Sequence, residues 1–119
     1  MEKLIFIVDD NDANLTMAAS ALENDYRILT MPSAEKMFSL LEKKKADLIL
    51  LDIEMPEMTG LEAIVKLKEN PQWKEIPCLF LTGRNEESIH SEAIQAGALD
   101  VVKKPIVPSI LLEYVKKYI

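Results

Sequence analysis

Residues 48–60 read LILLDIEMPEMTG, and this stretch decides the fold. It opens with four bulky apolar residues, as expected for a short strand that is buried on both faces. The carboxylate of Asp52 follows, and a loop marked by Pro56 and Gly60 comes next. Strands buried on both faces are typical of parallel sheets that carry helices on each side. The stretch therefore predicts an α/β fold in which Asp52 stands at the end of a strand.

Short apolar runs of the same kind recur along the chain. The strands are expected at residues 4–8, 26–31, 47–51, 76–81 and 99–102. Segments with helical spacing of apolar residues lie between them, which gives five strand–helix units. This (βα)5 pattern predicts a flavodoxin-like three-layer sandwich, whose parallel five-stranded sheet has the order 2-1-3-4-5.

The helices carry local signals at their ends. Asp12 is available as a cap for the first helix, and the three lysines at 43–45 suit the carboxyl end of the second. The third helix is expected after Gly60, the fourth over residues 86–96, and the fifth from Pro108.

The composition excludes several classes of protein. The 119 residues suit one domain, 49% of them are hydrophobic, and the net charge is −6. An acidic domain lacks the basic patch that nucleic-acid binding needs. Cys78 is the only cysteine, no apolar run is long enough to span a membrane, and no signal peptide is recognisable. These features predict a cytoplasmic domain that binds neither a membrane nor, by itself, nucleic acid.

Polar side chains stand where the predicted strands end. Asp9 and Asp10 follow the first strand, Asp52 the third, Thr82 the fourth and Lys104 the fifth. In a parallel sheet these ends share one edge, where α/β proteins bind their ligands. Crowded carboxylates either take up a proton or bind a cation, and Mg²⁺ suits such oxygen ligands. A metal, a lysine and hydroxyl donors are what phosphoryl transfer requires, and an aspartate nucleophile would give an acyl phosphate.

Five motifs in the right order resemble the receiver domain of two-component response regulators. They are Asp9-Asp10, residues 52–60, Thr82-Gly83, residues 97–100 and Lys104-Pro105. The resemblance covers the full length and implies one receiver (phospho-acceptor) domain over residues 1–119, either stand-alone or part of a longer regulator. It implies a phosphorylation-activated signalling switch of a two-component phosphorelay. Its only chemistry would be to accept and lose its own phosphoryl group.

The resemblance also assigns a role to each site residue. Asp52 would accept the phosphoryl group from a partner histidine kinase, Thr82 would move toward it, and Lys104 would pair with it. The Lys104–Pro105 peptide bond would be cis. The ligands of the Mg²⁺ cofactor would be Asp9 through water, Asp10, Asp52 and the backbone carbonyl of Glu54.

Protein partners follow from the same resemblance. A histidine kinase or a phosphotransfer protein would donate the phosphoryl group. An output domain or effector protein would bind the face formed by the fourth helix, the fifth strand and the fifth helix. Homodimer formation stays open, and the sequence identifies neither the kinase nor the signal.

A few positions set this chain apart from the usual family pattern. Val101 stands where the family often has an aromatic residue that swings inward on activation, and valine has no ring to swing. Glu54 and Arg84 occupy the two variable positions that tune how long the phosphoryl group survives. His90, the only histidine, is expected on an exposed or interfacial helix face.

Two other functions compete with this interpretation. A pseudo-receiver would bind partners without accepting phosphate, but such domains usually lack the Asp, Thr or Lys that this chain retains. A Mg²⁺-dependent phosphatase of the haloacid dehalogenase type would carry Asp-x-Asp after its first strand. Here the candidate nucleophile follows the third strand, and the second acid is Glu54.

Overall fold

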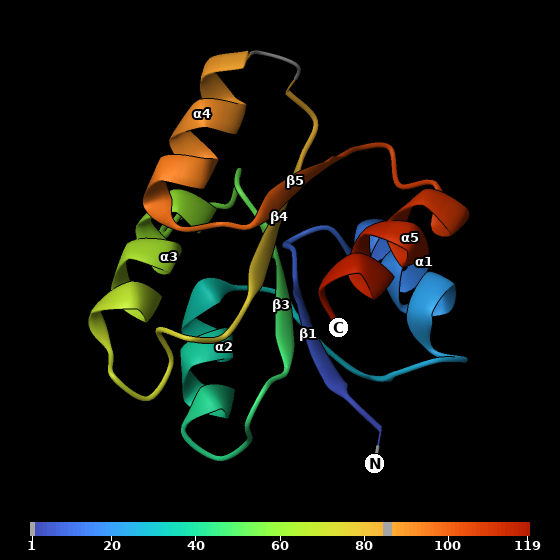
Figure 1. The fold of residues 1–119 in the computed structure, drawn as a ribbon, viewed down its shortest axis with the longest axis horizontal. Helices are drawn as coiled ribbons and strands as arrows, with labels where there is room; N and C mark the ends of the chain where they lie inside the picture. The colour runs from blue at the N-terminus through green and yellow to red at the C-terminus, as the bar shows by residue number, and fades with distance from the viewer. Residues whose placement is uncertain (1, 85–86) are drawn as a thin grey trace.

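The computed structural model describes residues 2–84 and 87–119, in which strands and helices alternate (Figure 1). The strands are β1 (Leu4–Val8), β2 (Arg27–Met31), β3 (Leu48–Asp52), β4 (Cys78–Thr82) and β5 (Asp100–Lys103). The helices are α1 (Asp12–Leu22), α2 (Ala34–Leu41), α3 (Gly60–Glu69), α4 (Glu87–Ala96) and α5 (Pro108–Tyr118). None of the helices in these two ranges has the length and apolar character that a membrane span requires.

The five strands form one parallel sheet in the order β2-β1-β3-β4-β5, which confirms the predicted topology. β2 is an edge strand with partly exposed residues, whereas β1, β3 and β4 are buried throughout. The strand order reverses between β1 and β3, and such a reversal opens a crevice outside the carboxyl ends of the strands.

Helices cover both faces of the sheet. Figure 1 shows α2, α3 and α4 on one side and α1 and α5 on the other. Alternate residues of one strand enter opposite cores. Phe6 packs in the core beneath α2, α3 and α4, and Ile5 and Ile7 pack in the core beneath α1 and α5. The three-layer sandwich is therefore confirmed, and its two packed cores give the carboxyl edge of the sheet a rigid support.

Four strands begin later than the sequence predicted, and for two of them a turn takes up the first residues. Tyr26 lies outside β2, since its N–H donates to the Leu22 carbonyl at 3.0 Å. β4 begins only at Cys78, because the Ile76 N–H closes another turn and Pro77 has no N–H to donate. The other late strands are β3, which begins at Leu48 and includes Asp52, and β5, which begins at Asp100.

One predicted helix cap is wrong, and the lysines predicted at the end of the second helix lie just beyond it. The cap of α1 is Asn11 and not Asp12, because the extended Asn11 backbone lets its side chain accept a hydrogen bond from the Asn14 N–H at 3.0 Å. The lysines at 43–45 lie beyond α2, which ends at Leu41, so they are not in its last turn. Pro108 does begin α5, as predicted. The predicted start of the fourth helix, at residue 86, lies outside the described residues.

Candidate functional site

Asp9, Asp10 and Asp52 come together at the carboxyl edge of the sheet. The register of β1 and β3 pairs Val8 with Leu51, so the next residues, Asp9 and Asp52, are neighbours. Carboxylate oxygens of the three aspartates lie within 4.8 Å of one another. Asp9 and Asp52 are buried, with exposed fractions of 0% and 1%, whereas Asp10 is exposed. Two of the three charges are therefore held away from bulk water.

Lys104 approaches both buried carboxylates. Its Nζ donates a hydrogen bond to Asp52 Oδ1 at 2.9 Å, and it lies 3.0 Å from Asp9 Oδ2. The backbone holds this lysine in place, because the Lys104 N–H donates to the Thr82 carbonyl at 2.8 Å. The Lys104–Pro105 bond is cis, as predicted. The lysine is thus a shared counter-ion for two carboxylates.

The environment of Asp52 raises its pKa from 3.8 to about 7. Burial is the main cause, and the charges of Asp9 and Glu54 add to it, while the hydrogen bond from Lys104 opposes it. For Lys104, burial alone would lower the pKa, but its contacts with Asp52 and Asp9 outweigh burial and raise it. The cluster therefore holds more negative charge than one lysine balances.

One buried oxygen shows that this arrangement suits a cation. Asp9 Oδ1 accepts a hydrogen bond from the Asn11 N–H at 2.9 Å, whereas Asp9 Oδ2 has only the ion pair with Lys104, at 3.0 Å, among the residues that the structure describes. Lys104 also pairs with Asp52, so this buried oxygen shares its one positive partner. Carboxylate oxygens are the hard donors that Mg²⁺ prefers. The residues present thus fit a divalent cation.

Thr82 lies at the same edge, but its hydroxyl faces Glu54. The Thr82 hydroxyl donates to the Glu54 carboxylate, at 3.0 Å to Oε1 and 3.3 Å to Oε2, and accepts from the Arg84 N–H at 3.1 Å. This use of the Glu54 side chain was not predicted from the sequence. The signal was available, because Glu54 and Thr82 follow or end adjacent strands, β3 and β4.

Gly60 shapes the loop that follows Asp52. The Gly60 N–H donates to the Ile53 carbonyl at 2.9 Å. A Cβ atom at residue 60 would lie 2.3 Å from the Asp52 carbonyl oxygen, so no side chain fits there. α3 can therefore start directly against the backbone of the buried aspartate, where the capping box of Thr59 and Glu62 fixes its first turn.

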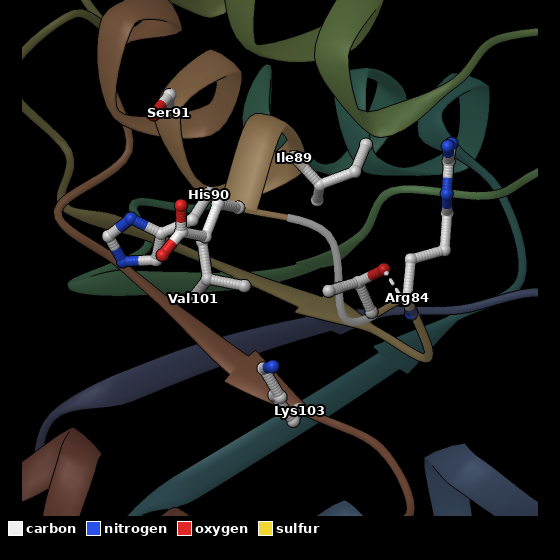
Figure 2. Close-up of a pocket in the computed structure, with 8 residues that line it drawn as sticks. Arg84, Ile89, His90, Ser91, Val101 and Lys103 are labelled. Carbon is white, nitrogen blue, oxygen red and sulfur yellow. Dashed lines mark hydrogen bonds between the residues drawn. The ribbon is translucent and has the colours of Figure 1, made fainter.

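A pocket of about 450 Å³ lies beside Thr82, between β5 and α4. Figure 2 shows Val101 and Lys103 of β5 and Ile89, His90 and Ser91 of α4 around it. Val101 is buried, and its small side chain leaves the pocket open. His90 lies on the exposed side, as expected, with Nε2 3.9 Å from Asp100 Oδ1.

Comparisons with known proteins agree with this geometry. The family model of the response regulator receiver domain matches residues 5–116. A protein of Vibrio cholerae named "Probable cyclic di-GMP phosphodiesterase" is 39% identical over 86% of this chain, which spans only 23% of that protein. The response regulator DivK of Brucella ovis is 29% identical, with 100% of this chain and 98% of DivK covered. The structure of the Vibrio cholerae chemotaxis protein CheY4 superposes with a TM-score of 0.94, at 26% identity and with both chains fully covered.

Proposed function

This chain belongs to the response regulator receiver domains, the phosphorylation-activated signalling switches of two-component systems, and we propose that Asp52 is the residue that accepts its phosphoryl group. The observation that carries the proposal is the setting of Asp52. It is a buried carboxylate at the end of a central strand, beside two other carboxylates and 2.9 Å from the Lys104 ammonium. Asp9 is equally buried, but one of its oxygens is already bonded to the Asn11 N–H.

The proposed reaction is an in-line transfer from a phosphohistidine of a kinase or phosphotransfer protein. A carboxylate oxygen of Asp52 attacks phosphorus, the P–N bond of the donor breaks, and the histidine nitrogen keeps the electron pair and takes up a proton. Asp52 must be ionised to attack, and the hydrogen bond from Lys104 favours the ionised form. The product is an acyl phosphate on Asp52.

We assign the Mg²⁺ cofactor to the acidic cluster. The residues that would hold it are Asp9, Asp10, Asp52 and the backbone carbonyl of Glu54. When bound, Mg²⁺ would neutralise the carboxylates and the phosphoryl oxygens. The support is that Asp9 Oδ2 shares its only positive partner, Lys104, with Asp52, and that three carboxylates approach to within 4.8 Å.

Thr82 and Lys104 would change partners once Asp52 is phosphorylated. Lys104 would shift its hydrogen bond from the carboxylate to a phosphoryl oxygen, and Thr82 would exchange Glu54 for another phosphoryl oxygen. A ligand shifts a conformational equilibrium only by its different contacts with the two states. In this proposal the Thr82–Glu54 hydrogen bond belongs to the unphosphorylated state, and its loss is the first step of the switch.

The proposed partners are a histidine kinase or phosphotransfer protein and an output domain or effector protein in the cytoplasm. We place the output surface on α4, β5 and α5, because exposed apolar side chains gather on these elements and their flanks. They are Ile94, Leu99, Val107 and Ile110. The net charge of −6 favours a protein partner over nucleic acid, and the same surface would serve a homodimer.

Intact-mass measurement with acetyl phosphate tests the proposal. The chain should gain one phosphoryl group when Mg²⁺ is present and none when the metal is chelated, whereas Asp52→Asn should gain none in either condition. No gain with Mg²⁺ would indicate a pseudo-receiver. Repeated turnover of a small phosphate ester, in excess over the protein, would indicate a phosphatase instead. The chain itself is expected to turn over only its own acyl phosphate.

A further inference from the structure

A long groove runs between α2 and α3, away from the acidic cluster. Its middle section has a volume of about 720 Å³ and is lined by three apolar residues, Phe38, Met58 and Trp73, together with polar and charged ones, which are Glu35, Ser39, Glu42, Lys43 and Lys66. The section shares Met58 with a hollow at the loop that follows β3, and it shares Trp73 with a hollow at the turn that follows α2. The three hollows therefore form one continuous surface, which we call the α2–α3 groove. Figure 1 shows its two helices on the same side of the sheet.

The floor of the α2–α3 groove is suited to an apolar partner. The rings of Phe38 on α2 and Trp73 in the turn after α3 are 5.6 Å apart and tilted by 37°, so they support each other. Phe38, Met58 and Trp73 are all only half-buried, which leaves part of each side chain open. Aromatic and methionine side chains in a groove between helices are typical of surfaces that bind an amphipathic peptide.

The two ends of the groove differ in charge. The end near the turn after α2 is lined by Lys43, Lys44 and Lys45 with one acid, Glu42, and the end near the loop after β3 is lined by Glu35 and Glu57. All six side chains are exposed. Within residues 2–84 and 87–119, none of the three lysines forms an ion pair.

The lysine cluster is basic in a chain whose net charge is −6. The lysines directly follow α2, and the Lys43 and Lys44 N–H groups donate to the Leu40 carbonyl, so their charge suits the carboxyl end of that helix. Three adjacent exposed lysines beside the groove also complement acidic residues on a partner.

We propose that the α2–α3 groove binds an amphipathic peptide segment of a partner protein. Apolar side chains of the segment would enter between Phe38, Met58 and Trp73, and its acidic residues would lie over the lysines at 43–45. The opposite charge at Glu35 and Glu57 sets the direction in which the segment lies. This surface is separate from the α4–β5–α5 face and from the acidic cluster, so it offers a second place for a protein partner.

Selection from a random peptide library tests the chemistry without a known partner. The immobilised wild-type domain should enrich peptides that combine acidic with aromatic or aliphatic residues. Immobilised Lys43→Glu/Lys44→Glu/Lys45→Glu should not enrich the same peptides. Basic or purely polar peptides, or equal enrichment on both proteins, would overturn the proposal.

Binding of an enriched peptide is then located with Trp73, the only tryptophan of the chain, whose indole N–H gives a single NMR signal. The signal should shift on titration. The triple lysine variant should weaken binding by at least ~10-fold, and Phe38→Ala should weaken it similarly. A variant with the same charge change elsewhere, Lys3→Glu/Lys116→Glu/Lys117→Glu, should bind within about twofold of wild type.

Other occupants of the groove give different results. An unmoved Trp73 signal, or equal losses in both triple variants, would contradict binding in the groove. Sedimentation of the free domain as a dimer that the Lys43–Lys45 variant dissociates would identify a second copy as the occupant. Binding of the domain to anionic vesicles in place of the peptides would identify a lipid surface. Either result would overturn the peptide proposal.

Discussion

Asp47 directly precedes the strand β3 and Asp52 ends it, yet the surroundings of the two aspartates differ completely. The Asp47 side chain accepts a hydrogen bond from the Leu4 N–H at 2.8 Å, and its backbone N–H donates to the Leu4 carbonyl at 2.8 Å. Asp52 lies among other carboxylates and shares its lysine with Asp9. The first carboxylate is satisfied by the fold and serves to join β1 to β3. The second needs more positive charge than the fold supplies, which is the property of a ligand site.

The largest expected effect is the response of the metal-free protein to pH. The folded state holds the Asp52 proton up to about pH 7, whereas the unfolded chain releases it near 3.8. The contribution of this proton to the free energy of unfolding is therefore complete below about pH 3.8. It is lost as pH rises through about 7, by up to about 1.4 kcal/mol per pH unit. Urea unfolding across this range, without metal, measures the slope.

Variants at two aspartates identify the source of that slope. Asp52→Asn should remove it and stabilise the metal-free protein at neutral pH, because a repelled buried charge is gone. Asp10→Asn should keep most of the slope, since Asp10 is exposed. A slope that persists in Asp52→Asn would show that another group holds the proton.

Removing the shared counter-ion should have the next largest effect. Lys104→Met leaves Asp9 and Asp52 without their closest positive charge, so the unfolding free energy at neutral pH should fall by about 2 kcal/mol. Proton uptake by Asp52 keeps the loss below that of a fully buried charge pair. Lys116→Met, on the exposed surface of α5, should change stability by less than ~0.5 kcal/mol. Equal losses in the two variants would contradict the role of Lys104.

Asp47, the carboxylate that the fold satisfies, should affect stability and not phosphorylation. Asp47→Ala leaves the Leu4 N–H without its partner and should cost about 1 kcal/mol in urea unfolding. Asp47→Asn keeps an acceptor oxygen and should cost less. Neither change should alter the yield of phosphorylation with acetyl phosphate and Mg²⁺. Loss of phosphorylation in Asp47→Asn would show that the two ends of β3 are not independent.

The smallest effect is expected at Glu54. Glu54→Ala removes the acceptor of the Thr82 hydroxyl and should change stability by less than about 1 kcal/mol. It should, however, let a phosphoryl mimic shift the NMR signals of Thr82 at a lower concentration, because the competing hydrogen bond is gone. Glu54→Gln keeps an acceptor and should respond more like wild type. Identical responses of all three proteins would show that Glu54 does not restrain Thr82.

The sequence predicted the topology and the site edge well, because both follow from strong and repeated signals. An apolar run such as residues 48–51 favours a buried strand, and the carboxylate directly after it is Asp52, the last residue of β3. The alternation with helices then leaves few topologies. This topology places β1 beside β3, and Asp9 and Asp52 are neighbours as a result.

The features that the sequence did not reveal depend on local geometry. Asn11 rather than Asp12 caps α1, because only one of two adjacent polar residues has the extended backbone of a cap. The contact of Gly60 with the Asp52 carbonyl and the Thr82–Glu54 hydrogen bond depend on how loops and strands meet in space. Residue types alone do not fix such distances.

Reductive trapping of the phosphorylated protein most directly distinguishes the two ends of β3. Borohydride converts an aspartyl phosphate to homoserine, and peptide mass spectrometry then locates the modified residue. After treatment with acetyl phosphate and Mg²⁺, the modification should be found at Asp52 and absent from Asp9, Asp10 and Asp47. Modification at any of those three in place of Asp52, in the wild-type protein, would contradict the assignment of the phosphoryl acceptor.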